Sequence, residues 1–124
     1  MSGRYKILIA EDEEYNYTLV KLIFEKEGVD VIRAHDGKEA IELLKNDKDI
    51  DLVLMDIKMP VMNGLDAARE IKKINSKMPI IAVTAYALRE DRPMCLRAGC
   101  DEIITKPINR QKLIDIAFHL MKSC

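Results

Sequence analysis

Short apolar runs alternate with longer amphipathic segments along the chain. The runs are rich in Ile, Val and Leu and are bounded by polar or turn residues, which is typical of strands buried in a sheet. They predict five strands, at Lys6–Ala10, Asp30–Ala34, Leu52–Asp56, Ile80–Thr84 and Glu102–Thr105. The segments that follow them repeat apolar positions at helical spacing and predict five helices, at about 14–27, 38–46, 65–75, 89–98 and 110–122.

Local signals mark the ends of several of these helices. Gly28 stops the first helix. The turn signal Asn63-Gly64 precedes the third helix, and Asn109 can cap the fifth. Within the first helix we expect one buried apolar stripe, formed by Leu19, Val20, Leu22, Ile23 and Phe24.

Five strands that alternate with five helices predict a parallel sheet with helices on both faces. We expect an α/β fold of the flavodoxin-like (βα)5 type, a three-layer sandwich with a parallel five-stranded sheet of order 2-1-3-4-5. In this order the chain reverses its direction of winding between strands 1 and 3, and sites form there, beyond the carboxyl ends of the strands. With 124 residues the chain suits one domain, so we expect a single domain over residues 1–124.

Composition argues against several classes of protein. The 20 basic and 21 acidic residues give a net charge of −1, so we expect no direct binding to nucleic acid. No apolar run approaches the roughly 20 residues that cross a bilayer and the N-terminus lacks a signal-peptide pattern, so we expect no membrane insertion. The cysteines, Cys95, Cys100 and Cys124, are odd in number and form no CxxC pair, which is typical of reduced thiols in a cytoplasmic protein.

Polar residues with complementary chemistry stand at the ends of four predicted strands. Strand 1 is followed by four acids, Glu11-Asp12-Glu13-Glu14, and strand 3 ends in Asp56. Strand 4 ends in Thr84, and Lys106 follows strand 5. In the expected strand order the acids and Asp56 lie side by side, Thr84 flanks Asp56, and Lys106 can reach back from one strand further out.

This set of residues suits phosphoryl chemistry. Carboxylates in one cleft repel each other and raise each other's pKa, and a hard divalent cation such as Mg²⁺ relieves the repulsion. A carboxylate such as Asp56 can attack phosphorus, while a metal ion, an ammonium and a hydroxyl stabilise the transferred group. Each residue alone has an ordinary explanation, for example acids that suit the first turn of a helix. Their convergence at one edge of the sheet favours a site.

Over essentially its whole length the sequence resembles the receiver domain of two-component response regulators. The matching stretches are Ile7–Asp12, Leu54–Gly64, Ile81–Ala85, Ala98–Glu102 and Thr105–Pro107. The sequences of Met55–Gly64 and Thr105–Asn109 look closest to those of receivers of hybrid sensor histidine kinases. The resemblance implies phosphorelay signal transduction, in which a histidine kinase or histidine phosphotransfer protein passes a phosphoryl group from phosphohistidine to Asp56.

The resemblance also implies roles for single residues. Asp56 matches the phosphoacceptor, and Lys106 matches the phosphate-binding lysine. Mg²⁺ or Mn²⁺ is expected on Asp12, Asp56 and the backbone carbonyl of Lys58, with Glu11 acting largely through water. Thr84 matches the switch hydroxyl, and Ala85 and Pro107 belong with the switch and modulating positions, the Lys106–Pro107 bond being cis in that family.

One position departs from the family pattern. An aromatic switch residue often stands three positions before the lysine, where this chain has Ile103. Phosphorylation should therefore repack the surface of helix 4, strand 5 and helix 5, which controls a partner or output, without a ring swing. A phosphorylation-dependent dimer is one state that the resemblance allows.

The expected activity is that of a signalling domain, not of an enzyme in the usual sense. The domain would take part in its own phosphorylation and in slow self-dephosphorylation. The resemblance places Lys58 and Tyr86 beside the expected path of the attacking water. The Tyr86 ring could cover the phosphoryl group, and the Lys58 ammonium cannot act as a base while charged.

Three other functions remain open from the sequence. A flavodoxin-like cofactor binder would need a Ser, Thr or Gly-rich phosphate loop where this chain has four acids. A phosphatase that forms an aspartyl-phosphate would need a second acid two residues after Asp56, where Lys58 stands. A degenerate receiver that acts only as a scaffold would not need the full set of acids, hydroxyl and lysine.

Overall fold

The alternation of strands and helices is the organising feature of the fold. The computed structural model describes residues 4–59, 61–85 and 91–122. Within them the elements run β1 (Lys6–Ala10), α1 (Glu14–Lys26), β2 (Asp30–Ala34), α2 (Gly37–Asn46), β3 (Leu52–Asp56), α3 (Gly64–Ile74), β4 (Ile80–Thr84), α4 (Asp91–Ala98), β5 (Glu102–Thr105) and α5 (Arg110–Lys122). All five strands match the prediction at both ends. No helix in the described part of the chain is long and apolar enough to cross a membrane.

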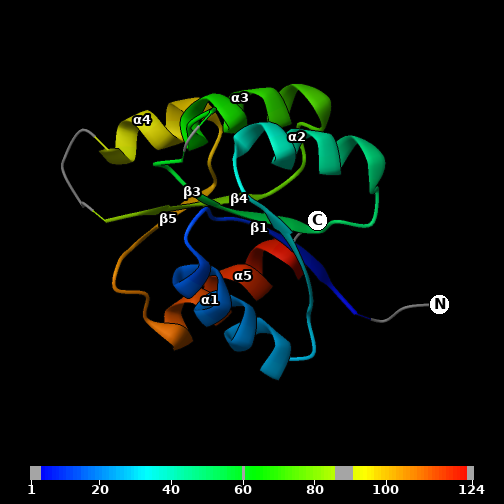
Figure 1. Ribbon diagram of the computed structural model, residues 1–124, viewed down its shortest axis with the longest axis vertical. Coiled ribbons are helices and arrows are strands. Elements are labelled where there is room, and N and C mark those ends of the chain that lie inside the picture. The colour runs from blue at the N-terminus through cyan, green and yellow to red at the C-terminus, as the bar shows by residue number, and fades with distance from the viewer. Residues whose placement is uncertain (1–3, 60, 86–90, 123–124) are drawn as a thin grey trace.

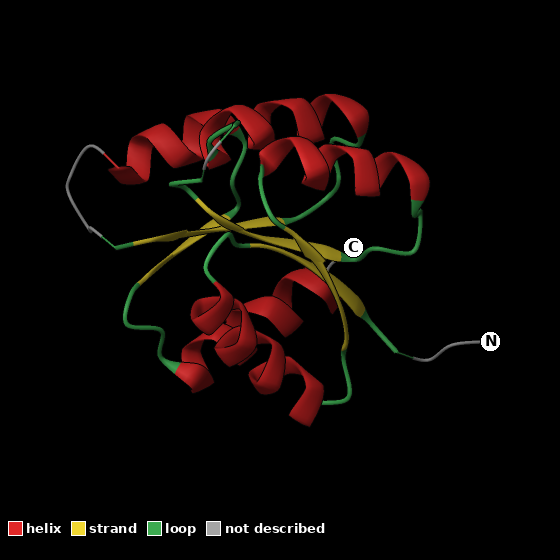
Figure 2. Ribbon diagram, viewed as in Figure 1, coloured by secondary structure: helices red, strands yellow, loops and turns green. Residues whose placement is uncertain are grey.

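The sheet has the predicted topology. Its strands are parallel and lie in the order β2-β1-β3-β4-β5. Helices α1 and α5 cover one face of the sheet, and α2, α3 and α4 cover the other (Figures 1 and 2). The three-layer sandwich brings the carboxyl ends of β1 and β3 next to each other, because Ala10 pairs with Met55.

Two hydrophobic cores hold the sheet between its helical layers. Alternate strand residues point to opposite faces, so Leu8 and Val53 pack under α2 and α3, whereas Ile7 and Leu54 pack against α1 and α5. Strands β3 and β4 are buried over their whole length. Full burial of one such side chain contributes roughly 1.5–3 kcal/mol to the stability of the fold. The central strands are therefore a rigid support for the residues that follow their carboxyl ends.

Helix α1 has two apolar sides instead of the one expected stripe. Its sheet-facing side buries Val20, Ile23 and Phe24. Leu19 and Leu22, which were predicted to be buried with them, are exposed, and Tyr15 is exposed as well. Because positions 15, 19 and 22 lie on one side of a helix, these three residues form a solvent-facing stripe, called here the α1 stripe.

The segment Asn63-Gly64 has a more specific role than a turn. Asn63 caps α3, since its Oδ1 accepts a hydrogen bond from the Asp66 backbone N–H at 2.9 Å. Gly64 is the first helical residue, and its N–H donates to the Ile57 carbonyl at 2.8 Å. A Cβ on Gly64 would lie 2.6 Å from the Asp56 carbonyl oxygen, so only glycine lets α3 begin directly behind Asp56.

Other local predictions are also confirmed. Gly28 follows α1 with a φ of 76°, the left-handed conformation that glycine adopts readily. Asn109 Oδ1 accepts from the Lys112 N–H at 3.0 Å at the start of α5. The Lys106–Pro107 peptide bond is cis. The predicted helix 89–98 is observed from Asp91, and residues 89 and 90 lie outside the described segments.

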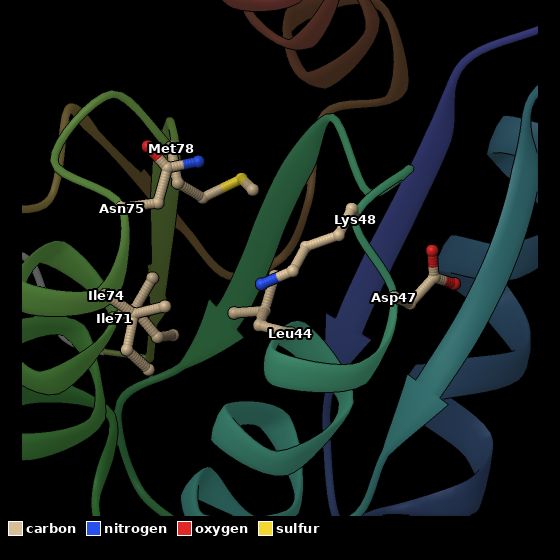
Figure 3. A pocket seen from close by; sticks show the side chains of 7 residues that line it. All are labelled: Leu44, Asp47, Lys48, Ile71, Ile74, Asn75 and Met78. Carbon is tan, nitrogen blue, oxygen red and sulfur yellow. The ribbon is translucent and has the colours of Figure 1, made fainter.

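A cavity of about 180 Å³ lies between the C-terminal ends of α2 and α3, on the side of the sheet opposite the carboxyl ends of the strands (Figure 3). Its walls are mainly Leu44, Ile71 and Met78, and Lys48 reaches over it. Asp47 points away from these side chains, and its Oδ2 pairs with Lys6 Nζ at 2.6 Å. Asp47 is thus the one carboxylate among the described residues that line this cavity, and it is already paired with Lys6, in contrast to the several acids at the carboxyl ends of the strands.

The loop after β3 contains a strained backbone position that gives a first prediction. Val61 has a φ of 69°, which a β-branched residue rarely adopts, and its side chain is 79% exposed. Asn tolerates this conformation better, so we expect Val61→Asn to raise the free energy of unfolding by roughly 1 kcal/mol. Urea denaturation checks this, with Val61→Thr as the control that adds polarity and keeps the branched Cβ. An equal gain in both variants would show that polarity, not backbone strain, is responsible.

Candidate functional site

A cleft of about 220 Å³ lies at the carboxyl edge of the sheet. It is lined by Asp12, Glu13, Asp56, Ile57, Lys58, Thr84, Ala85 and Lys106. These residues follow the ends of β1, β3, β4 and β5. The structure thus brings the polar strand-end residues named from the sequence into one place, at the point where the strand order reverses.

Asp56 lies at the centre of this cleft and is only 8% exposed. Its Oδ2 accepts a hydrogen bond from Lys106 Nζ at 3.1 Å, and its Oδ1 accepts one from the Lys58 backbone N–H at 3.1 Å. The backbone continues the sheet past the carboxylate, because the Ile57 N–H donates to the Val83 carbonyl at 3.0 Å. Asp56 is therefore held by a rigid backbone and points its carboxylate at a cation.

Lys106 reaches back over one strand, as its long side chain allows. The backbone N–H of Lys106 donates to the Thr84 carbonyl at 2.8 Å, and this bond fixes the backbone from which the side chain extends. Nζ lies 3.1 Å from Asp56 Oδ2 and 3.8 Å from Glu11 Oε1. Although burial opposes it, the hydrogen bond to Asp56 and the charges of Asp56 and Glu11 raise the pKa of Lys106. The ammonium therefore stays charged in the cleft.

Glu11 is the most deeply buried acid of the site, with 6% of its surface exposed. Burial raises the pKa of Glu11 to about 7, and the nearby charge of Asp56 adds to the effect. The Glu13 N–H, which donates to Glu11 Oε2 at 3.1 Å, and the charge of Lys106 lower the pKa and offset part of the increase. The carboxylates are thus only partly neutralised by the protein's own cations.

The acids of the cleft fit a divalent cation. One carboxylate oxygen from each of Glu11, Asp12 and Asp56 lies within 4.8 Å of the others. Mg²⁺ prefers such oxygen ligands and retains part of its water, and Asp12 is open to solvent. Burial is the main reason that the pKa of Glu11 is raised, and a bound cation would favour the charged form of this carboxyl.

The remaining acids of the run differ from this set. Glu13 borders the cleft and accepts a hydrogen bond from Asn16 Nδ2 at 2.6 Å. Glu14 pairs with Arg33 Nη1 at 2.6 Å and is exposed. The sequence had given no reason to single out Arg33, because an isolated basic residue in a predicted strand is not a motif.

Three of the proposed switch and modulating positions, Lys58, Thr84 and Ala85, line the cleft. Thr84 is buried at the end of β4, and Ala85 is exposed in the cleft lining. Lys58 is exposed and also lines the cleft. Ile103 is buried in the core beneath α2, α3 and α4. Tyr86 lies outside the described residues.

Comparison with known proteins agrees with this arrangement. A family model described as the response regulator receiver domain matches residues 7–118. Hybrid signal transduction histidine kinase I of Dictyostelium discoideum is 40% identical over 119 residues, which cover 90% of this chain and 7% of that protein. The chain thus spans only a small part of that relative's length.

Solved structures of receiver domains superpose closely. The receiver domain of the Pseudomonas aeruginosa PAO1 sensor histidine kinase PA1611, with a magnesium ion in its active site cleft, gives a TM-score of 0.89 at 34% identity and covers 97% of this chain and 99% of that one. A chain from the co-crystal of the Saccharomyces cerevisiae histidine phosphotransfer protein Ypd1 with the receiver domain of Ssk1 gives 0.83 at 27% identity, covering 90% and 84%.

Fold, cleft and comparisons together define the class of the protein. The chain belongs to the response regulator receiver domain family, whose members are signalling domains of two-component phosphorelays. The resemblance found in the sequence is confirmed.

The raised pKa of Glu11 makes the stability of the metal-free protein depend on pH. The folded state holds the Glu11 proton to about pH 7, whereas the unfolded chain loses it near the ordinary value of 4.5. Stability from this group is therefore full below pH 4.5 and is lost as the pH rises to about 7. We expect urea unfolding with a chelator present to show that the parent loses stability relative to Glu11→Gln between about pH 5 and pH 7.5. A difference that stays constant with pH would contradict the raised pKa.

Proposed function

We propose that the chain accepts a phosphoryl group on Asp56 from the phosphohistidine of a histidine kinase or a histidine phosphotransfer protein. The observation that carries this proposal is the environment of Asp56, whose carboxylate lies 3.1 Å from the Lys106 ammonium and within 4.8 Å of oxygens of Glu11 and Asp12. A nucleophile, a cation and a cluster of metal-binding oxygens thus meet in one partly open cleft.

The chemistry is a transfer of phosphorus from nitrogen to oxygen. An Asp56 carboxylate oxygen attacks phosphorus, the P–N bond of the donor breaks, and its electron pair stays on the imidazole, which takes up a proton. Lys106 neutralises negative charge on the phosphoryl oxygens, and the Thr84 hydroxyl donates a hydrogen bond to one of them. Asp12, Asp56 and the Lys58 carbonyl would hold Mg²⁺, with Glu11 acting through water, and the ion would supply further positive charge at the phosphoryl group.

The partner is proposed to dock on α1, beside the cleft. The α1 stripe of Tyr15, Leu19 and Leu22 is exposed, and α1 begins two residues after Asp12. Apolar residues at positions i, i+4 and i+7 fit the face of a helix of another protein. A histidine on such a partner helix would lie close to Asp56, and a co-crystal of a similar receiver with a histidine phosphotransfer protein supports this class of partner.

The output is proposed to be a change in the surface of α4, β5 and α5. Thr84 leads from the site toward this surface, because β4 pairs with β5 through Thr84 and Thr105. Ile103 is buried in β5, so its core packing, not a swinging ring, would transmit the change. Loss of the phosphoryl group is proposed to be slow, because the exposed Lys58 ammonium cannot act as a base while charged.

The first test concerns the phosphoacceptor. Asp56→Asn keeps the shape of the side chain and removes its nucleophilic charge. We expect mass spectrometry, after incubation with a small phosphodonor and Mg²⁺, to find one added phosphoryl group on the parent and none on the variant. The matched control, Asp115→Asn on α5, should be labelled like the parent. Equal acid-labile incorporation in Asp56→Asn would refute the assignment of Asp56.

The second test concerns the metal ligands. Asp12→Ala removes an oxygen of the cluster, whereas Glu14→Ala removes an acid that pairs with Arg33. Loss of an outer partner of a metal site typically costs about 10–100-fold in affinity, so loss of Asp12 itself should weaken Mg²⁺ binding at least tenfold. Glu14→Ala should bind within about twofold of the parent. Calorimetric titration measures both, and equal losses in the two variants would rule out the proposed ligand set.

A further inference from the structure

Arg33 makes an unusually complete set of contacts with the loop that carries the acids. It lies on β2, beside Ile9 of β1 in the sheet register, and its side chain is only 14% exposed. Nε and Nη2 donate to the Glu11 carbonyl at 3.2 and 3.1 Å, and Nη2 also donates to the Asp12 carbonyl at 3.3 Å. Nη1 pairs with Glu14, and the guanidinium lies 4.5 Å from the centre of the Tyr17 ring.

The loop needs such support because the start of α1, which follows it, has no side-chain cap. Glu13, the N-cap of α1, makes no side-chain capping hydrogen bond. The backbone bond from the Glu11 N–H to the Ala34 carbonyl, at 3.0 Å, secures the beginning of the loop, and the next turn relies on Arg33. A guanidinium is suited to this task, since its planar fork presents several N–H donors in fixed directions and stacks on an aromatic ring.

We propose that Arg33 is a positioning residue of the metal site. By holding the carbonyls of Glu11 and Asp12 on the far side of the loop, it orients their side chains toward Asp56 and opposes the repulsion among the three carboxylates. Arg33 makes its contacts with backbone carbonyls and with Glu14, not with the carboxylate oxygens that gather in the cleft. The inference rests on the proposed function, because it assumes that the cluster binds Mg²⁺.

The contact with Glu14 does not explain the arrangement. Glu14 is largely exposed, and exposed ion pairs contribute little. The two bonds to the Glu11 carbonyl are partly buried, and the bonds to the Glu11 and Asp12 carbonyls act directly on the backbone of two proposed ligands. Removal of Arg33 should therefore affect metal binding, and removal of Glu14 should not.

The experiment compares Arg33→Ala and Arg33→Lys with the parent by calorimetric Mg²⁺ titration. We expect both variants to bind Mg²⁺ at least about tenfold more weakly, the usual cost of losing an outer partner of a metal site. Lys keeps the charge but cannot reach two carbonyls with one fork, so it should not restore the affinity. Glu14→Ala and Arg69→Ala, which removes an exposed arginine of α3, should bind like the parent.

A second readout separates positioning from general damage. The Mg²⁺ concentration that gives half-maximal phosphorylation by a small phosphodonor should rise about tenfold or more in Arg33→Lys, while the rate at saturating Mg²⁺ stays near that of the parent. If Arg33→Ala does not fold, the lysine variant decides alone. Parent-like Mg²⁺ affinity in Arg33→Lys, or an unchanged half-maximal concentration, overturns the inference.

The parent itself separates this inference from the function on which it rests. A parent that binds no Mg²⁺ or takes no phosphoryl group on Asp56 would refute the proposed function. A parent that does both, alongside Arg33 variants with unchanged affinity, would refute only the role of Arg33.

Discussion

Repulsion among three closely spaced carboxylates is the constraint on which the rest of the structure depends. Glu11, Asp12 and Asp56 place oxygens within 4.8 Å of one another, an arrangement that an isolated loop would relax at once. It persists because the strands that carry these acids are buried between two cores and cannot separate without losing both. Lys106 relieves the repulsion from inside the cleft, and the charge of Asp56 adds to burial in raising the pKa of Glu11.

Two glycines extend this rigidity to the loop behind Asp56. A Cβ on Gly64 would lie 2.6 Å from the Asp56 carbonyl oxygen, and one on Gly37 would lie 2.7 Å from the Met62 carbonyl oxygen. The first turns of α3 and α2 therefore press directly on this loop. A side chain at Gly64 would push against the backbone of Asp56 itself, and one at Gly37 would push against Met62 further along the loop.

The sequence was sufficient for the fold and for the acids because both follow from regular patterns. Buried parallel strands read as continuous apolar runs, and their topology places residues such as Asp56 and Lys106 at one edge. The exposure of Leu19 and Leu22 could not be predicted. When a helix has two apolar sides, hydrophobicity alone does not reveal which side packs against the sheet. The role of Arg33 could not be predicted, because its acceptors are mainly backbone carbonyls, which every residue possesses.

The bond between Lys106 and Asp56 affects the free-energy difference between the unmodified protein and the phosphorylated state proposed for it. The ammonium is already partly buried and paired with Asp56 in the unmodified protein. Under the proposed function, an arriving phosphoryl group would therefore take over an existing counter-ion and would not recruit a new one from water. Lys106 would then add less to the free-energy difference between the two states than a newly recruited cation, and the binding energy of a partner can shift a small difference in either direction.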